Sequence, residues 1–276
     1  YDSTDTIVAI SKVTHDIVKN VSPDVDLYYL PHAVNPKYFK PLEHEQVEEL
    51  KSKSNFDKNK FLVFWNNRNA RRKQSGTLIH WFKKFLDRVG DENAMLVMHT
   101  DPADINGPNL QAVIHNLNLT SGQVQFSTNK LEFPQLAAIY NMADVTVNIS
   151  DAEGFGLSTL ESLSCGTPII VNMTGGLQEQ VTDGEEWFGI GIDPCSKSVI
   201  GSQEIPFIYE DRINEDDFVD ALEKIYNMSK EERRELGLKG AAHVDKNYNF
   251  NKYVTSWDMI LKEIHEKHGS WENRKG

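Results

Sequence analysis

The chain has 276 residues, 39% of them hydrophobic and 25% charged, a balance that is ordinary for a globular protein. Its formal net charge of −12 argues against a general nucleic-acid-binding protein, because such proteins carry a basic face. No window approaches the roughly 18 to 20 uncharged apolar residues of a membrane span, so no transmembrane segment is predicted, and no charged-then-apolar leader opens the chain.

The first 42 residues are predicted to contain a piece of one domain and a connecting segment. Residues 6–10 and 26–30 are apolar runs that predict strands, with a helix between them. A unit of this size cannot build a core alone, and the chain enters it almost at once from Tyr1. We therefore expect residues 1–30 to be the tail of an upstream domain and the chain to be a fragment. Residues 31–42, with three prolines, are predicted to be a linker.

The next segment alternates short apolar runs with helical patterns. Apolar residues recur at helical spacing in residues 77–89 and 132–143. Short strands without polar alternation, interleaved with such helices, indicate a parallel sheet that is covered on both faces. The right-handed crossover rule then predicts an α/β fold with a Rossmann-like, doubly wound parallel sheet. The predicted strands lie at residues 61–65, 94–98, 123–126, 144–149 and 167–171.

The C-terminal part is predicted to be helical. Residues 193–212 lack periodicity, and we expect them to form an irregular excursion. From Asn214 the pattern is helical almost to the end, and Ser229 with Glu232 three residues later matches a capping box. The main domain is therefore expected at residues 43–250, followed by a C-terminal helix and tail at 251–276.

Residues 150–172, SDAEGFGLSTLESLSCGTPIIVN, are the most informative stretch. A predicted strand and helix meet there, so the turn at 153–156 lies at the carboxyl end of a parallel strand, where open α/β sheets bind ligands. We expect Gly154 and Gly156 to adopt positive φ and to let the backbone approach a ligand. Three free N–H groups would face that ligand at the positive end of the helix dipole. They belong to Phe155, Gly156 and Leu157.

Two glutamates flank these amides. Glu153 lies in the turn, and Glu161 lies about one helical turn into the following helix. A carboxylate accepts hydrogen bonds at both oxygens, so each can hold two neighbouring hydroxyls of a sugar. Such a pair on either side of phosphate-binding amides suits a sugar joined through phosphates to a ribose. Acidic residues at the start of a helix are also favoured for capping and dipole reasons, which is the alternative interpretation of the pair alone.

A basic run follows the first strand of the main domain. The residues NNRNARRK gather Arg68, Arg71, Arg72 and Lys73 within six positions. An acidic protein that binds an anion needs such a local cluster. Taken alone, the run is better interpreted as a solvated loop.

These features together resemble the family-4 (group 1) retaining glycosyltransferases of the GT-B fold. The donor domain of that family carries E-G-F-G, a second glutamate eight positions after the first, and a C-G-x-P-V/I-I strand, and this chain has EGFGLSTLESLSCGTPII. Arg68 and Lys73 match an arginine and lysine of the family that are five positions apart, although Arg71 and Arg72 intervene.

Two further segments resemble the family in the same order along the chain. LYYLPHAVNPKYF resembles the inter-domain stretch, with departures at Ala33 and Asn35. TGGLQEQVTDG resembles a segment with a glycine pair and an acidic residue, here Gly175, Gly176 and Glu179.

The resemblance implies a role for each site residue. Glu161 would hold the ribose hydroxyls and Glu153 the hydroxyls of the donor sugar. Arg68 and Lys73 would stabilise the charge that grows on the leaving diphosphate, and with Glu153 they are the predicted catalytic residues. Residues around Asn129 and Lys130 would lie near the base, and no metal or other cofactor is expected.

The implied function is retaining transfer of a sugar from a nucleotide-diphosphate sugar to a glycan, lipid or protein acceptor. The leaving phosphate itself would accept the proton of the acceptor. Residues 1–30 would then belong to an acceptor domain that is mostly absent, through which the protein could associate with a membrane, and this fragment alone could be inactive. The alternatives are a non-catalytic nucleotide-sugar-binding module, or an epimerase or phosphorylase of the same fold.

Several other signals are discounted. Asp24–Asp26 resembles an Asp-x-Asp metal motif, but a turn is the preferred interpretation, and HEKH at 265–268 is interpreted as a solvated helix tail. For His32, a structural role and a substrate contact both remain open. Cys165 and Cys195 are too few for a disulfide framework or a zinc site, so a reducing, cytoplasmic setting is expected.

Overall fold

The computed structural model describes residues 3–270; residues 1–2 and the predicted tail from 271 onward lie outside the described part. The strands are β1 (Thr6–Ala9), β2 (Asp26–Tyr29), β3 (Phe61–Asn66), β4 (Ala94–His99), β5 (Val124–Ser127), β6 (Val145–Asn148), β7 (Ile169–Asn172), β8 (Gly189–Ile192), β9 (Ser196–Ile200) and β10 (Ile208–Arg212). The helices are α1 (Lys12–Val21), α2 (His44–Lys53), α3 (Ser75–Val89), α4 (Leu110–Asn116), α5 (Phe133–Met142), α6 (Leu157–Ser164), α7 (Gln178–Val181), α8 (Glu215–Tyr226), α9 (Lys230–Asn247) and α10 (Phe250–His268), with short 3₁₀ turns η1 (Arg71–Lys73) and η2 (Gly175–Leu177).

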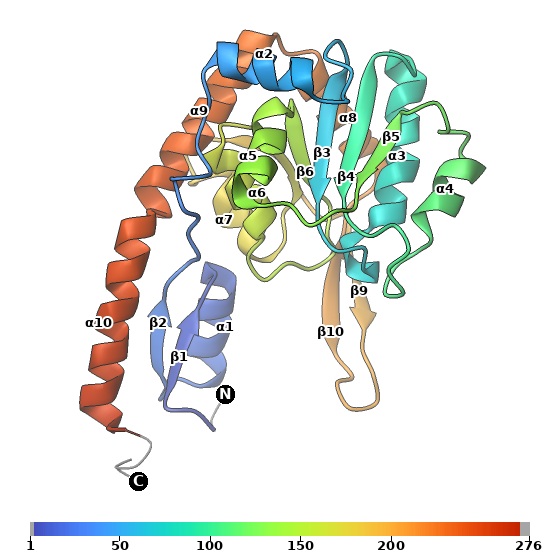
Figure 1. Ribbon diagram of the computed structural model, residues 1–276. Helices are drawn as coiled ribbons and strands as arrows, with labels where there is room; N and C mark the ends of the chain where they lie inside the picture. The colour runs from blue at the N-terminus through green and yellow to red at the C-terminus, as the bar shows by residue number, and fades with distance from the viewer. Residues whose placement is uncertain (1–2, 271–276) are drawn as a thin grey trace.

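Six parallel strands form the central sheet in the order β5-β4-β3-β6-β7-β8 (Figure 1). The chain starts at β3 in the middle, adds β4 and β5 on one side, and then returns to place β6, β7 and β8 on the other. The predicted doubly wound α/β fold is therefore confirmed. Since the chain leaves β3 and β6 in opposite directions, their carboxyl ends form the switch point at which open α/β sheets bind ligands.

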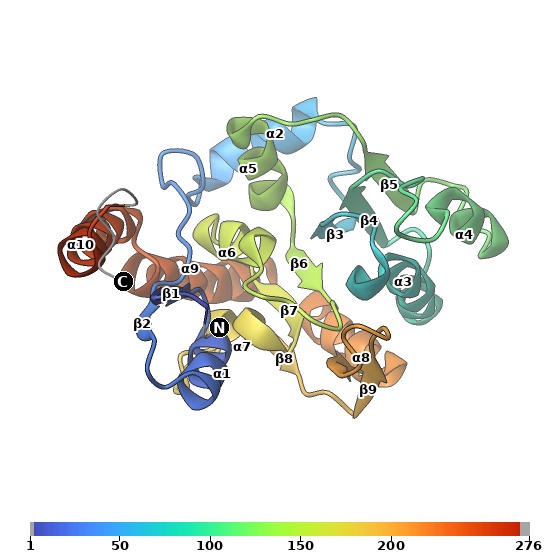
Figure 2. The same ribbon diagram turned by 90° about the horizontal axis from the view of Figure 1, so that it is seen from below.

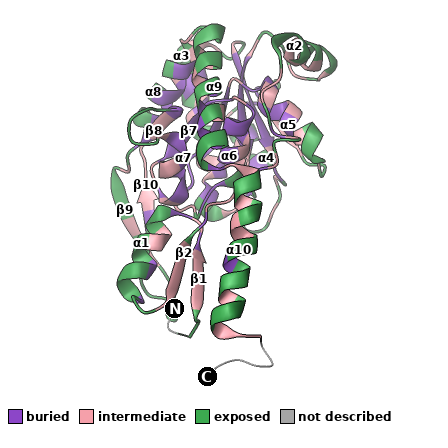
Figure 3. Ribbon diagram, turned by 90° about the vertical axis from the view of Figure 1, so that its left-hand side faces the viewer, coloured by how far each residue is buried: buried purple, intermediate pink, exposed green. Residues whose placement is uncertain are grey.

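Alternate residues of the central strands pack on opposite faces of the sheet. Val63 and Trp65 of β3 join a core with α3, α4 and α8, whereas Leu62 and Phe64 join a second core with α5, α6, α7 and α9. All four side chains are almost completely buried, as the unalternating apolar run predicts for a strand that is covered on both faces. Figures 2 and 3 show the helices around the sheet and the buried residues gathered on it.

The N-terminal residues form a separate small unit. Strands β1 and β2 pair in parallel with each other and not with the central sheet, and α1 connects them. Helix α10 lies alongside this unit (Figure 1). The Tyr28 hydroxyl donates to Glu263 of α10 at 2.9 Å, and the Asp26 carboxylate binds Lys267 and His268. The end of the described chain therefore packs against its beginning.

The expectation of an irregular segment at 193–212 is wrong. Strands β9 and β10 pair antiparallel there and form a hairpin that projects past the edge of the central domain (Figure 1). Val199, Phe207 and Tyr209 on its outer part are 58%, 73% and 61% exposed. Because most of the hairpin does not cover a core, burial imposes no alternation on its sequence, and the periodicity that reveals other strands is missing.

Helix α9 packs closely on the end of α6. The predicted capping box begins it: Ser229 Oγ accepts from the Glu232 N–H at 3.1 Å, and the Glu232 carboxylate accepts from the Ser229 N–H at 2.7 Å. Two turns later, Gly237 faces the backbone of Gly166. A Cβ at position 237 would lie 1.8 Å from the Gly166 carbonyl oxygen, so only glycine permits this approach.

We predict that Gly237→Ala lowers the free energy of unfolding by about 2 kcal/mol, because the cost of overpacking exceeds the gain of about 1 kcal/mol in helix propensity. Urea denaturation measures this change. Lys239→Ala, at an exposed position of the same helix, is the control and should change stability by less than about 0.5 kcal/mol. Equal stability of Gly237→Ala and the wild type would contradict the close packing.

Candidate functional site

An ion pair joins the two loops that leave the switch point. Lys73 ends η1 after β3, and its Nζ atom binds Glu153 Oε2 in the loop after β6. Both side chains are only 10% exposed. Burial lowers the pKa of Lys73, and the Glu153 carboxylate opposes this shift. Arg72 Nη1 lies 3.6 Å from the same carboxylate oxygen and donates to the Ala152 carbonyl at 2.5 Å. Two cations from one loop therefore flank one carboxylate of the other.

The turn between β6 and α6 depends on one glycine more than on the other. Gly156 has φ +91° and immediately precedes α6, so the positive φ expected there is confirmed. Gly154 does not have positive φ, which corrects the expectation for that residue. A Cβ at position 154 would meet only Ile10 Cδ1 at 4.0 Å, so a side chain is sterically tolerated there.

Backbone N–H groups are available at this turn. Within residues 3–270, the N–H groups of Phe155, Gly156 and Leu157 donate no hydrogen bond. They lie at the start of α6, where the helix dipole favours an anion. Their use by a ligand stays a prediction.

Buried polar groups hold the turn from behind. Gln180 Nε2 donates to the Phe155 carbonyl at 2.7 Å and to the Gly156 carbonyl at 3.2 Å, and Thr159 Oγ1 donates to the Gly156 carbonyl at 2.8 Å. Gln180 and Thr159 are both 0% exposed. Neither residue is predicted from the sequence, where the one signal is a glutamine inside a short segment flanked by apolar residues.

The glycine pair of the next loop packs on the same turn. A Cβ at Gly175 would lie 1.7 Å from the Glu153 carbonyl oxygen, and one at Gly176 would lie 2.7 Å from Phe155 Cα. The Gly176 N–H also donates to the Glu153 carbonyl at 3.3 Å. Two residues without side chains are therefore needed for the loops after β6 and β7 to touch.

Glu161 belongs to a hydrogen-bonded chain at the other end of the turn. The buried Tyr140 hydroxyl donates to Glu161 Oε2 at 2.8 Å and accepts from Asn66 Nδ2 at 2.9 Å. Burial raises the pKa of Glu161 to about 7, although the hydrogen bond from Tyr140 lowers it. Asn66 is the last residue of β3, so the Tyr140 hydroxyl connects Glu161 to the end of that strand.

Other predicted site residues are not brought to the Lys73–Glu153 pair. The Arg68 side chain is 67% exposed, and its Nε atom donates to Asp104 Oδ2 at 2.6 Å. Arg72, which the sequence spacing treated as an intervening residue, lies beside Glu153 instead. Asn129 and Lys130 lie in an exposed loop after β5, and their assignment to the base stays a prediction.

The N-terminal unit borders this site. The His32 ring packs edge-on against Phe155, with ring centroids 5.1 Å apart, and burial lowers the pKa of His32. The Glu179 carboxylate accepts from the Lys12 N–H at 2.9 Å and from the Tyr29 hydroxyl at 3.1 Å. The aromatic contact gives His32 a packing role and leaves a substrate contact open.

The two segments whose resemblance to metal motifs was discounted, residues 24–26 and 265–268, contact each other. Asp26 of the Asp-x-Asp run is the carboxylate that binds Lys267 and His268 of the HEKH run. Among residues 3–270, no group of three or more His, Cys, Asp or Glu residues could hold a metal ion.

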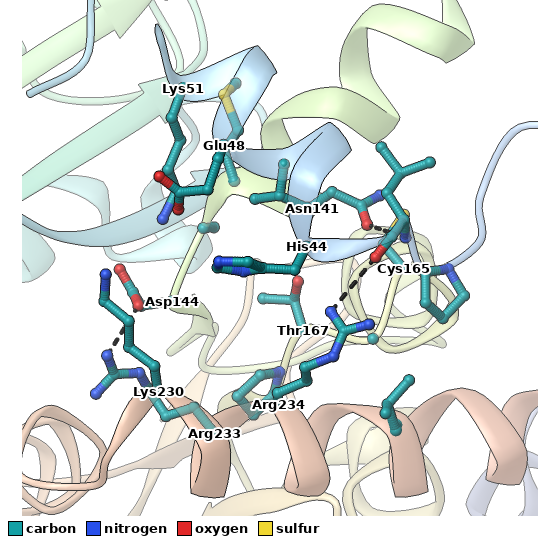
Figure 4. A pocket seen from close by; sticks show the side chains of 18 of the residues that line it. His44, Glu48, Lys51, Asn141, Asp144, Cys165, Thr167, Lys230, Arg233 and Arg234 are labelled. Carbon is teal, nitrogen blue, oxygen red and sulfur yellow. Dashed lines mark hydrogen bonds and ion pairs between the residues drawn. The ribbon is translucent and has the colours of Figure 1, made fainter. Parts of the chain in front are cut away.

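A separate hollow of about 280 Å³ lies at the amino ends of β6 and β7 (Figure 4). Its two arginines are engaged with the protein itself. Arg233 Nη2 binds Asp144 Oδ1 at 3.1 Å, and Arg233 also donates to the Met228 carbonyl at 2.5 Å. Arg234 is turned toward the Leu42 carbonyl. We interpret this hollow as a junction of α2, α9 and the sheet, on the opposite edge from the switch point.

The doubly wound sheet and its glycine turn match the GT-B fold of glycosyltransferases. A family model described as "Glycosyl transferases group 1" matches residues 46–243, and the chain belongs to this family. The chain is 33% identical over 112 residues to D-inositol 3-phosphate glycosyltransferase of Paenarthrobacter aurescens (strain TC1). This match covers 41% of the chain and 22% of that relative.

Two solved structures share the fold. Sucrose-phosphate synthase from Thermosynechococcus elongatus matches with a TM-score of 0.76 at 22% identity, over 95% of this chain and 59% of that one. HepE from Anabaena, in complex with UDP and glucose, matches with a TM-score of 0.70 at 12% identity, over 94% of this chain and 63% of that one. The chain thus spans less than two thirds of each of these proteins. None of the helices within residues 3–270 is long and apolar enough to cross a membrane.

Glu161 should make the stability of the protein depend on pH. Its pKa is raised from 4.5 to about 7, so the folded state binds more protons than the unfolded state between these values. The contribution of Glu161 to stability is present below pH 4.5 and is lost as the pH rises through 7. The free energy of unfolding of Glu161→Gln, relative to that of the wild type, should therefore rise by about 2–4 kcal/mol between pH 4.5 and 8, as measured by urea denaturation.

Glu235→Gln, at an exposed position of α9, serves as the control. The difference between its free energy of unfolding and that of the wild type should be the same at both pH values. The same stability difference for Glu161→Gln at both pH values would contradict a raised pKa at this position.

Proposed function

We propose that this chain forms the donor-binding side of a retaining glycosyltransferase that takes a sugar from a nucleotide-diphosphate sugar. The observation that carries the proposal is the buried Lys73–Glu153 ion pair at the switch point, between the Gly156 turn and Glu161. Membership of the group 1 family supports the reaction class, and the HepE complex, with the same fold, supports a nucleotide such as UDP in the donor.

In this proposal the diphosphate lies on the free N–H groups of the turn, with Lys73 and Arg72 beside it. Negative charge grows on the diphosphate as the glycosidic bond breaks. Lys73 is already held by Glu153 and little exposed, so its charge needs little reorganisation to stabilise the leaving group. Removing one such preorganised donor typically costs roughly 3–4 kcal/mol of transition-state stabilisation. Arg68 could join after release from Asp104, since its side chain is exposed.

Glu161 is assigned to the ribose hydroxyls. Hydroxyl donors favour the ionised carboxylate, so ribose binding would lower the raised pKa of Glu161. The hydrogen bond from Tyr140 leaves the second carboxylate oxygen for a ligand. Glu153 is assigned to the hydroxyls of the donor sugar, while its paired oxygen keeps Lys73 in place.

Retention follows because the acceptor attacks the face of the anomeric carbon from which the phosphate leaves, so no covalent intermediate on Glu153 is needed. In the proposed step the bond between the anomeric carbon and the phosphate oxygen breaks, and the acceptor oxygen bonds to the same face of that carbon. The proton of the acceptor hydroxyl passes to the leaving phosphate oxygen, which balances the reaction without a further base. The acceptor is a glycan, lipid or protein.

We predict that one nucleoside diphosphate among UDP, GDP, ADP and dTDP raises the melting temperature of the protein. A ligand at 100 times its Kd stabilises the folded state by about 2.7 kcal/mol, or several degrees for a chain of this size. Glu161→Gln should weaken calorimetric binding of that diphosphate roughly 10- to 100-fold, the effect of one hydrogen bond to a charged group.

Arg88→Gln is the matched control because it removes an ion pair with Asp220 and Glu223 far from the switch point. It should leave the Kd unchanged. Binding that is equally tight in Glu161→Gln would remove Glu161 from the ribose site, and a flat response to all four diphosphates would refute donor binding.

We also predict that proton NMR of the first-formed product shows the anomeric configuration of the donor sugar. Glu153→Gln should lower kcat/KM roughly 10- to 100-fold, since it weakens one charged hydrogen bond but leaves the chemistry intact. An inverted product would refute retention. Complete loss of turnover in a folded Glu153→Gln protein would instead indicate that Glu153 takes part in bond formation.

A further inference from the structure

The β9–β10 hairpin is attached to the candidate site at its base. A two-stranded ribbon is only marginally stable by itself, so its orientation depends on contacts with the rest of the protein. Glu210, near the end of β10, is 2% exposed, and its carboxylate accepts two hydrogen bonds from the Arg71 guanidinium, at 2.9 Å and 2.5 Å. Arg71 begins η1, two residues before Lys73. A buried hairpin carboxylate therefore holds the turn that carries Lys73.

The same strand also holds the loop that carries Glu153. Arg212 Nη1 binds Asp151 Oδ2 at 2.8 Å, and Arg212 Nη2 binds Glu210 Oε2 at 2.9 Å. The Asp211 N–H donates to the Asp151 carbonyl at 2.8 Å. Asp151 is 3% exposed and lies two residues before Glu153. Three consecutive residues of β10 thus contact both loops that supply the Lys73–Glu153 pair.

The loop after β7 is attached to the same strand. Asn172 Nδ2 donates to the Asp211 carbonyl at 2.9 Å, and Thr174 Oγ1 donates to Asp211 Oδ2 at 2.7 Å. Thr174 directly precedes the glycine pair that packs on the turn at Glu153. The loops after β3, β6 and β7 therefore meet at one short stretch of β10.

The carboxylates of this network are buried although the Arg71 side chain is 57% exposed, and the network is a weak source of stability because desolvation of the ions offsets much of their attraction. It is well suited to fixing geometry, since the bidentate Arg71–Glu210 pair accepts only one relative orientation. The two site loops also touch directly, through the Asp151 N–H and the Arg72 carbonyl at 2.8 Å. The hairpin adds a second and more rigid constraint, which acts on both loops at once.

We infer that Glu210 is a positioning residue that holds Lys73 against Glu153, and that the β9–β10 hairpin is a structural part of the donor site. This inference rests on the proposed function for its effect on donor binding, but its effect on Lys73 does not. Without the Glu210 charge, the Arg71 guanidinium loses one of its two bonds and the charge that strengthens the other, η1 shifts, and Lys73 becomes more exposed.

The first test measures the exposure of Lys73 without any ligand. The protein is treated briefly with acetic anhydride, and acetylation of Lys73 is quantified by peptide mass spectrometry. Glu210→Gln keeps the shape of the side chain and should raise acetylation of Lys73 roughly fivefold or more, as expected for local opening of a buried site. Glu204→Gln, at the exposed end of the same hairpin, is the control and should leave acetylation unchanged.

Arg71→Lys provides a second variant in case Glu210→Gln folds poorly. It keeps the positive charge but cannot make both bonds, so it should raise acetylation of Lys73 by a smaller factor. Circular dichroism at the labelling temperature confirms that each variant is folded. Unchanged acetylation of Lys73 in folded Glu210→Gln overturns the inference.

The second test measures the Kd of the nucleoside diphosphate that stabilises the wild type. Glu210→Gln should weaken binding roughly tenfold, because one charge-assisted bond from Lys73 to the diphosphate is misplaced. Increased acetylation with an unchanged Kd would overturn the role of Glu210 in the donor site. If the wild type binds no diphosphate, the proposed function fails, whereas acetylation of Lys73 still decides the positioning role.

Discussion

The candidate site depends on the ion pair between Lys73 and Glu153. Both side chains are mostly buried, and either charge alone would be costly in that environment, because removing one partner of a buried pair typically costs about 3–5 kcal/mol. The partners are 80 residues apart in sequence. Only the reversal of strand order between β3 and β6 brings the loops that carry them together. The strand order therefore brings the two charges together, and each charge needs the other to be stable where it is buried.

Around the pair, further polar contacts hold the backbone of the turn. Gln180 and Thr159 hold the carbonyl groups of the turn from inside the core. Gly175 and Gly176 let a third loop lie directly on it. With the carbonyl groups engaged, the N–H groups of the turn remain on the other side, which is the polarity that an anionic ligand requires.

The same third loop connects the turn with the N-terminal unit. Gly175 and Gly176 touch the turn at one end of this segment, and Glu179 at its other end accepts from Lys12 and Tyr29. Five residues thus join the part of the site assigned to the donor to the unit that borders it. Burial raises the pKa of Glu179, and the hydrogen bonds from Lys12 and Tyr29 lower it. The N-terminal unit is therefore linked to the turn through a short segment.

The sequence by itself determined strands β3 to β7 of the central sheet and the turn at Glu153–Gly156, since apolar periodicity and glycine positions are local properties. Tertiary structure alone decided that Lys73 pairs with Glu153, that Arg72 and not Arg68 lies beside Glu153, that Tyr140 is the partner of Glu161, and that residues 193–212 form a hairpin. Each of these depends on which side chains from distant strands meet at one edge of the sheet. No pattern within a short stretch of sequence encodes such a meeting, because it is set by strand order and register.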